Sequence, residues 1–249
     1  MGENIKILEV KNLTKRYPSF SVEDVSFSVP QGKIVGVIGR NGAGKSTVLK
    51  CITGLDYADF GEIRVFGEKR GKGAEWKERV GAVFGGIDFY PYKKLSVLSK
   101  AYSRFYSRWN ADTYEKLCVR FGLDGGKRFR DLSNGMKVKF LLALACSHEA
   151  ELFVFDEPTS GLDPVSRAEV LVLMRSLVKN GRRSVLFSTQ ITSDIEKCAD
   201  EIVYIRKGKI ARAAPKEEFL RSYAGENGEP LSLEEIMIKE EGVHEEFNY

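Results

Sequence analysis

The alternation of apolar and polar residues in the early part of the chain predicts β-strands on both sides of a glycine-rich loop. Residues 5–10 and 20–29 alternate in the way that half-buried strands do, and residues 62–66 continue the pattern. Residues 33–38 form an almost wholly apolar run, which is typical of a strand buried on both faces. Residues 47–55 then carry apolar side chains at helical spacing. We therefore expect a buried strand, a loop and a helix in succession.

A block with a helical pattern interrupts the strands in the middle of the chain. A strand is predicted at residues 79–84, after which residues 94–122 show helical spacing and no strand-like alternation. Residues 134–146 continue as a helix, and a short, wholly apolar strand follows at residues 152–155. We expect an inserted helical block over residues 90–145, approximately.

The segments after this strand alternate helices and strands, which is typical of a parallel sheet covered by helices. Helices are predicted at residues 165–179 and 194–198, and strands at residues 184–188 and 201–205. Together with the earlier strands, these segments predict an α/β fold with a mostly parallel sheet.

The end of the chain is acidic. Residues 226–249 hold eight glutamates and one lysine, which we interpret as a solvated tail. A short helix is expected at residues 232–240, where Ser232 and Glu235 have the spacing of a capping box.

Length, composition and charge narrow the class of protein. The 249 residues suffice for one large α/β domain, and 43% hydrophobic with 30% charged residues is ordinary for a soluble protein. The longest apolar run, residues 140–146, is far too short to span a membrane, and the first residues carry no apolar signal segment. A net charge of +4 is too small to indicate nucleic-acid binding. The four scattered cysteines, without a C-x-x-C pair, indicate a reducing compartment.

The glycine-rich loop after the first buried strand carries the clearest chemistry. Residues 39–46 read Gly-Arg-Asn-Gly-Ala-Gly-Lys-Ser, a complete G-x-x-x-x-G-K-[ST] pattern. Glycines let the backbone N–H groups converge on phosphate oxygens, and the start of the following helix favours the same anion. Lys45 adds a positive charge near the β- and γ-phosphates, and the Ser46 hydroxyl can hold Mg²⁺. The sequence predicts a nucleotide-phosphate site here.

Two adjacent carboxylates form the second feature. Residues 151–157 read Glu-Leu-Phe-Val-Phe-Asp-Glu, an apolar strand that ends in Asp156 and Glu157. In a parallel sheet, the carboxyl ends of strands form the ligand-binding edge. Asp156 is expected to reach Mg²⁺, and Glu157 to orient or deprotonate a water in line with the γ-phosphate.

The combination of these features resembles the nucleotide-binding domain of ATP-binding cassette (ABC) transporters, over residues 5–222. Besides the loop and the paired acids, the order and spacing of three further segments match, namely Leu-Ser-Asn-Gly-Met at 132–136, Ser-Gly-Leu-Asp at 160–163 and Ser-Thr-Gln at 188–190. The resemblance implies a P-loop NTPase core with a mostly parallel sheet, an N-terminal antiparallel β subdomain and an inserted helical subdomain. It places this nucleotide-binding domain at residues 1–222 and leaves an acidic tail at 223–249.

The resemblance also assigns roles that the residue types alone leave open. Ser133 and Gly135 would bind the γ-phosphate of ATP held by an opposite subunit, although Ser133 is also simply a good helix N-cap. Tyr17 would stack on adenine, or else pack in a loop. Asp163 would couple the two sites of a dimer, and it also suits a helix start before Pro164.

The expected site residues fall into three groups. Glu157, Lys45 and Gln190 are the catalytic candidates, while Ser46 and Asp156 are the candidate metal ligands. The nucleotide-binding candidates are Tyr17, Gly39, Arg40, Asn41, Gly42, Ala43, Gly44, Lys45, Ser46, Thr47, Ser133, Gly135 and Asp163.

The sequence departs from the family pattern at residues that bear on hydrolysis. Gly85 stands where the family has a glutamine after the strand at 79–84, so Asp88, backbone or water would have to substitute. Gln190 replaces the usual histidine and cannot carry a proton or a positive charge at neutral pH. Asn134 and Met136 replace the signature glycine and glutamine, and because asparagine tolerates the left-handed region, we expect the loop geometry to survive.

The resemblance implies an ATP-hydrolysing subunit, with ATP and Mg²⁺ as ligands, that powers a separate integral membrane permease. A second ATP-binding subunit would complete each site, and the protein would lie on the cytoplasmic face of the cell membrane. The sequences of residues 132–137 and 191–196 resemble those of exporter-type subunits. The permease would dock on the aromatic side chains at 89–92 and at Tyr102, Phe105, Tyr106 and Trp109. Packing of these side chains in the core explains their presence equally well. The alternatives are a soluble ABC ATPase and an ATP-binding regulatory cassette with slow hydrolysis.

Overall fold

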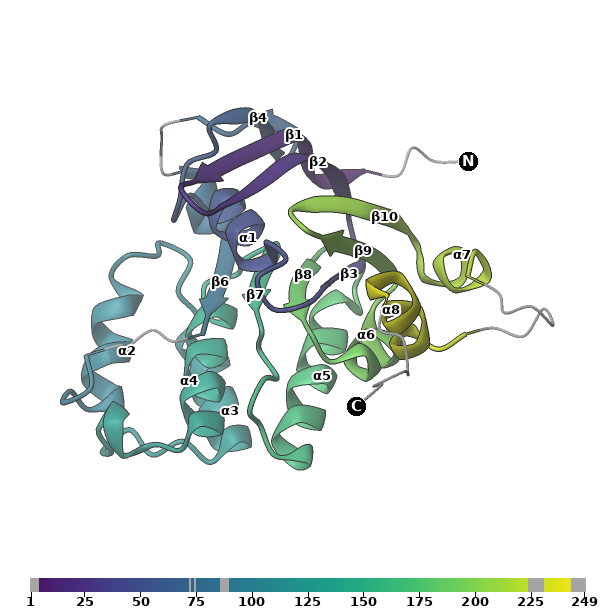
Figure 1. The fold of residues 1–249 in the computed structure, drawn as a ribbon. Helices are drawn as coiled ribbons and strands as arrows, with labels where there is room; N and C mark the ends of the chain where they lie inside the picture. Colours follow the sequence, from purple (N-terminus) through teal and green to yellow (C-terminus); the bar gives the residue numbers. More distant parts are fainter. Residues whose placement is uncertain (1–4, 72, 74, 86–89, 224–230, 243–249) are drawn as a thin grey trace.

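A mostly parallel β-sheet forms the centre of the molecule (Figure 1). The computed structural model describes residues 5–71, 73, 75–85, 90–223 and 231–242. Within them the sheet has six strands in the order β10-β9-β3-β8-β7-β6, and β10 alone pairs antiparallel. The strands are β3 (Ile34–Ile38), β6 (Val80–Phe84), β7 (Leu152–Asp156), β8 (Ser184–Thr189), β9 (Glu201–Arg206) and β10 (Lys209–Pro215).

The three middle strands are buried along their whole length, which explains their continuous apolar sequences. Their register aligns the carboxyl ends, because Ile38 pairs with Thr189 and Asp156 pairs with Ser188. The residues that directly follow β3, β7 and β8 therefore meet at one edge of the sheet, where the sequence places its candidate chemistry.

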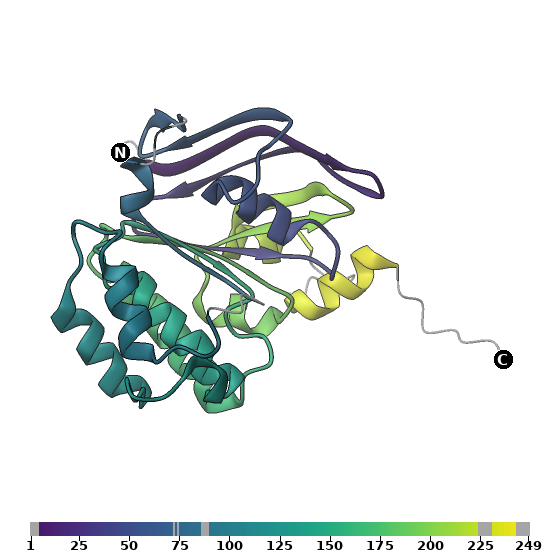
Figure 2. The ribbon, with the colours of Figure 1, turned by 90° about the vertical axis from the view of Figure 1, so that its left-hand side faces the viewer.

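A smaller antiparallel sheet covers one face of the central sheet (Figure 2). Its strand order among the described residues is β2-β1-β4-β5, and helix α1 (Lys45–Thr53) lies between the two sheets. Val48, Leu49 and Ile52 of α1 are buried in the same hydrophobic cluster as side chains from both sheets. The strands are β1 (Lys6–Tyr17), β2 (Phe20–Pro30), β4 (Phe60–Val65) and β5 (Glu68–Lys69), and the 3-10 helix η1 (Glu75–Arg79) leads into β6.

Helices cover the opposite face of the central sheet and form the block between β6 and β7 (Figures 1 and 2). A second core cluster joins that face of the sheet to the later helices, while the inserted block has a small core of its own around Phe129 and Phe140. The helices are α2 (Leu95–Ser103), α3 (Ala111–Phe121), η2 (Phe129–Asp131), α4 (Asn134–Cys146), α5 (Pro164–Val178), α6 (Thr192–Cys198), α7 (Lys216–Arg221) and α8 (Leu233–Glu241).

The helical pattern predicted at 94–122 is two helices in the structure. A segment of turns separates α2 from α3, and Asn110 starts α3 by accepting a hydrogen bond from the Thr113 N–H at 2.8 Å. Strand β10 and helix α7 were not predicted from the sequence. Strand β10 alternates exposed and half-buried residues at the sheet edge, so it lacks the apolar run that marks the buried strands.

The prediction of a solvated acidic tail is wrong for the described part of that tail. The expected short helix and its capping box are confirmed in α8, with Ser232 and Glu235 bonded to each other's backbone. However, Leu233 and Ile236 are fully buried in the large helix-side core, because α8 packs against α6. The helix is part of the folded body.

All four cysteines are free, and Cys51, Cys146 and Cys198 are buried. Among the described residues, no helix combines the length and the apolar character that crossing a membrane requires.

Candidate functional site

The phosphate loop connects β3 to α1 at the carboxyl edge of the sheet (Figure 1). A cavity of about 490 Å³ opens over it, lined by residues 40–47 together with Phe20, Glu157, Ser160 and Gln190. Gly44 caps α1 with φ of 110°, a conformation that suits glycine. A side chain at Gly39 would overlap the carbonyl oxygen of Ile205, so β9 supports the loop directly.

Lys45 lies at the bottom of this cavity with only 5% of its surface exposed. Its ammonium donates to the carbonyl oxygens of Gly39 and Arg40 at 2.7 and 3.2 Å, and lies 3.3 Å from Oε1 of Glu157. These acceptors can use all three of its N–H donors. The lysine is therefore fixed by its own chain, and arriving phosphates would compete with Glu157 for it.

Asp156 joins the phosphate loop to the neighbouring strands. Its Oδ1 accepts hydrogen bonds from the Ser46 hydroxyl at 2.9 Å and from the Ser188 hydroxyl at 2.6 Å. Asp156 is 9% exposed, and the contacts come from α1, β7 and β8. A hydroxyl and a carboxylate oxygen thus converge at the start of α1, and both are the hard oxygen ligands that Mg²⁺ takes.

Glu157 adopts a backbone conformation that is unusual for a residue with a side chain. Its φ is 50°, in the left-handed region, and the Ser188 hydroxyl accepts its N–H at 3.0 Å. The turn directs the carboxylate toward Lys45 and toward the backbone N–H of Gln190, which donates to Oε2 at 3.4 Å. Strained residues of this kind often occur at functional sites, at a cost of about 1–3 kcal/mol.

Asp194 connects the loops that follow the site residues, a contact that the sequence analysis did not find. It is fully buried at the start of α6, where Oδ2 accepts from the Thr159 hydroxyl at 2.6 Å. Its Oδ1 accepts from Nε of Arg167 on α5 at 2.5 Å. The carboxylate ties together the loop after Glu157, the start of α5 and the segment after Gln190. No sequence pattern marks this contact, since its three members lie far apart in the chain.

Ser133, Gly135 and Asp163 lie outside the phosphate cavity of their own chain. Ser133 caps α4 by accepting from the Met136 N–H at 3.2 Å. Asp163 caps α5 by accepting from two backbone N–H groups at 3.0 Å, and the Ser166 contacts lower the pKa of its carboxyl. The capping predictions for both residues are confirmed. Asn134 is the first residue of α4, directly after the cap at Ser133.

Tyr17 ends β1 and is 38% exposed, with its hydroxyl donating to Oδ2 of Asp56 at 2.5 Å. That hydrogen bond is the main reason why the pKa of Asp56 is lowered. Tyr17 does not line the phosphate cavity, whereas Phe20 of β2, which the sequence analysis did not select, does.

A second cavity of about 480 Å³ lies between Gly85, Glu157 and the start of α4. A side chain at Gly85 would meet no atom within 4 Å, so the position faces open space. Asp88, the candidate substitute for the missing glutamine, lies outside the described residues.

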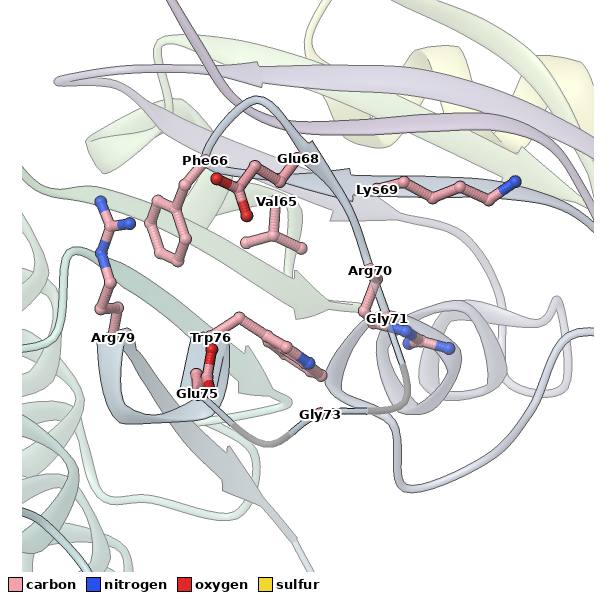
Figure 3. Close-up of a pocket in the computed structure, with 10 residues that line it drawn as sticks. All are labelled: Val65, Phe66, Glu68, Lys69, Arg70, Gly71, Gly73, Glu75, Trp76 and Arg79. Atoms are coloured by element: carbon pink, nitrogen blue, oxygen red, sulfur yellow. The ribbon is translucent and has the colours of Figure 1, made fainter.

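Another hollow, of about 380 Å³, lies beside η1 and the β4–β5 hairpin (Figure 3). Its lining contains none of the predicted site residues. Arg79 stacks on the ring of Phe66 at 3.7 Å and bonds to Glu151 at 2.7 and 2.9 Å. Its charge is therefore already neutralised, and we assign the functional site to the phosphate loop.

Comparison with known proteins identifies the family of this chain. The ABC transporter family profile matches residues 22–160. The bacitracin transport ATP-binding protein BcrA of Enterococcus faecalis is 33% identical over 82% of this chain and 68% of its own length. The glutamate/aspartate import ATP-binding protein GltL of Escherichia coli (strain K12) is 33% identical over 86% of this chain and 92% of its own length. A solved structure described as an ATP-binding subunit of an ABC transporter is similar with a TM-score of 0.83 and 29% identity, covering 94% of this chain and 98% of that one.

A phosphate loop before α1, with two adjacent carboxylates at the end of the parallel strand β7, is the arrangement of a phosphate-loop NTPase. The chain belongs to the ABC transporter family, as an ATP-binding subunit that hydrolyses ATP.

Replacing Lys45 tests the phosphate site. In Lys45→Met the side chain keeps similar bulk but loses its charge, so we expect ATP affinity to fall about 10- to 100-fold by titration calorimetry. Lys50→Met, on the exposed face of the same helix, is the matched control and should bind like the wild type. Equal affinities for the two variants would contradict the site.

Proposed function

We propose that this subunit works as one half of a two-chain ATPase that drives a separate membrane permease. The observation that carries the proposal is the separation of Ser133, Gly135 and Asp163 from the phosphate cavity of their own chain. Ser133 leaves a hydroxyl at the positive end of α4, a suitable site for a phosphate that its own chain does not supply. A head-to-tail pair about a two-fold axis places the two half-sites opposite each other.

We assign the chemical step to residues around the cavity. Glu157 accepts a proton from water as the water oxygen attacks the γ-phosphorus, and the bond to the ADP oxygen breaks. Lys45 and the loop N–H groups stabilise the phosphate charge, while Gln190 donates an amide N–H to it. Ser46 and Asp156 would hold Mg²⁺, which supplies further charge neutralisation at the phosphates. Tyr17 would contact the adenine outside the phosphate cavity.

The proposed permease contact is a groove of about 280 Å³ between α1, β6 and the helical block. Leu55 is 63% exposed at its rim. Phe105 is 78% exposed and lies in the sequence between Tyr102 and Tyr106, which line the groove. Tyr102 and Tyr106 stack on each other with ring centroids 4.8 Å apart, so they act as part of the groove wall. Exposed apolar side chains around a groove are typical of a protein contact.

The location on the cytoplasmic face of the membrane follows from that proposed partner. Relatives are named for both bacitracin transport and amino-acid import, so the direction rests on this chain's own sequence. We propose export, because residues 132–137 and 191–196 resemble exporter-type subunits.

The dimer is tested with Glu157→Gln. The amide cannot accept the water proton, so bound ATP should persist and hold two chains together in size-exclusion chromatography with light scattering. Glu115→Gln, an exposed carboxylate on α3, should remain monomeric under turnover conditions, like the wild type. A Glu157→Gln variant that stays monomeric at saturating ATP would contradict the two-chain site.

Gln190 leads to a prediction about rate and pH. Because an amide does not titrate, we expect slow ATP turnover without an inflection near the ordinary histidine pKa of about 6.5. Gln190→His should raise kcat about ten-fold or more and introduce that inflection. The proposal fails if the wild type shows such an inflection after His148 and His244 are replaced, or if the histidine variant gains no rate.

The permease contact is tested with Leu55→Asp. A charge at the groove rim should prevent co-purification of an integral membrane partner from native membranes, because the carboxylate would be buried there. Val119→Asp, at a position 83% exposed on α3 and outside the groove, should retain the partner. Retention by both variants would exclude this groove.

A further inference from the structure

The C-terminal helix α8 ends against the phosphate loop (Figures 1 and 2). Its first turn is fixed by the capping box and by the Leu233 N–H, which donates to Oε1 of Glu196 at 3.0 Å. Leu233 and Ile236 are fully buried beneath it. The first two turns of α8 are therefore held against the body of the protein, which positions the last turn.

The last turn of α8 carries Glu240 and Glu241, where the negative end of a helix disfavours carboxylates. Each is offset by a specific contact. Glu240 lies 3.0 Å from the guanidinium of Arg206 on β9, and Oε1 of Glu241 accepts from the Tyr204 hydroxyl at 3.0 Å. A charge that opposes local helix preference and has dedicated partners often marks a functional position.

Glu241 also faces the phosphate loop. Its Oε2 lies 3.8 Å from Nη1 of Arg40, and its side chain is only 10% exposed, whereas that of Arg40 is 66% exposed. Arg40 is among the residues that line the phosphate cavity. Its guanidinium is therefore within reach of two kinds of anion, the carboxylate of α8 and the phosphates of a bound nucleotide.

We propose that Glu241 competes with the phosphates of ATP for Arg40, so that α8 lowers the affinity of the phosphate loop for nucleotide. Glu241 is a positioning residue that acts through Arg40. The coupling is reciprocal, because a nucleotide that attracts Arg40 must weaken the attachment of the last turn of α8 by the same factor.

Glu241→Gln isolates the charge. The amide oxygen can still accept from Tyr204, and loss of a negative charge at the end of a helix is favourable, so α8 should stay folded. We expect the Kd for ATP to fall about two- to five-fold, the range for a partly exposed ion pair. The matched control is Glu240→Gln, which removes the same charge from the same turn. Because Glu240 pairs with Arg206 and not with Arg40, this variant should leave the Kd for ATP unchanged.

A double-mutant cycle with Arg40 decides whether the effect of Glu241 on ATP affinity passes through Arg40. Arg40→Gln should weaken ATP binding, and adding Glu241→Gln to it should change the Kd by less than about 1.5-fold. The proposal is overturned if Glu241→Gln does not bind ATP more tightly than the wild type. It is also overturned if Glu240→Gln gains as much ATP affinity as Glu241→Gln, or if Glu241→Gln gives its full gain in affinity in the Arg40→Gln background.

Amide hydrogen exchange on the full chain gives a second readout that a purely structural role of Glu241 would not move. A non-hydrolysable ATP analogue should accelerate exchange in residues 236–241 of the wild type, and much less in Glu241→Gln. Exchange that is unchanged or slowed by the analogue in the wild type would contradict competition for Arg40.

Discussion

The carboxylate of Asp156 is the contact on which the rest of the site depends. It binds the hydroxyls of Ser46 and Ser188, and so joins the helix after the phosphate loop to two neighbouring strands. The contact exists because the parallel register brings the ends of β7 and β8 to the same level. Since a buried carboxylate is costly without such partners, the site and the sheet stabilise each other.

Much of this arrangement could be predicted from the sequence, and for a physical reason. Strands buried on both faces must be apolar along their length, and a loop that wraps phosphates needs glycines at fixed positions. Both requirements leave patterns within a few adjacent residues. The sequence could therefore predict the phosphate loop, the strand that ends at Asp156 and the cap at Asp163.

The features that the sequence did not reveal depend on contacts between distant segments. The edge strand β10 has no apolar run, because only one of its sides is paired with the sheet. The acidic end of the chain resembled a solvated tail because composition does not show that Glu240 and Glu241 meet Arg206 and Arg40. Charge patterns describe a segment by itself, whereas its burial is decided by what packs against it.

Asp194 has a consequence for how the site moves. Its buried carboxylate holds Thr159 and Arg167, and so attaches the segment after Gln190 to the start of α5. Breaking such a buried pair is expensive, so α5 and α6 are held together at their ends nearest the site. Because Asp163 caps the same end of α5, a displacement of that cap would move α5 and the segment after Gln190 together, not separately.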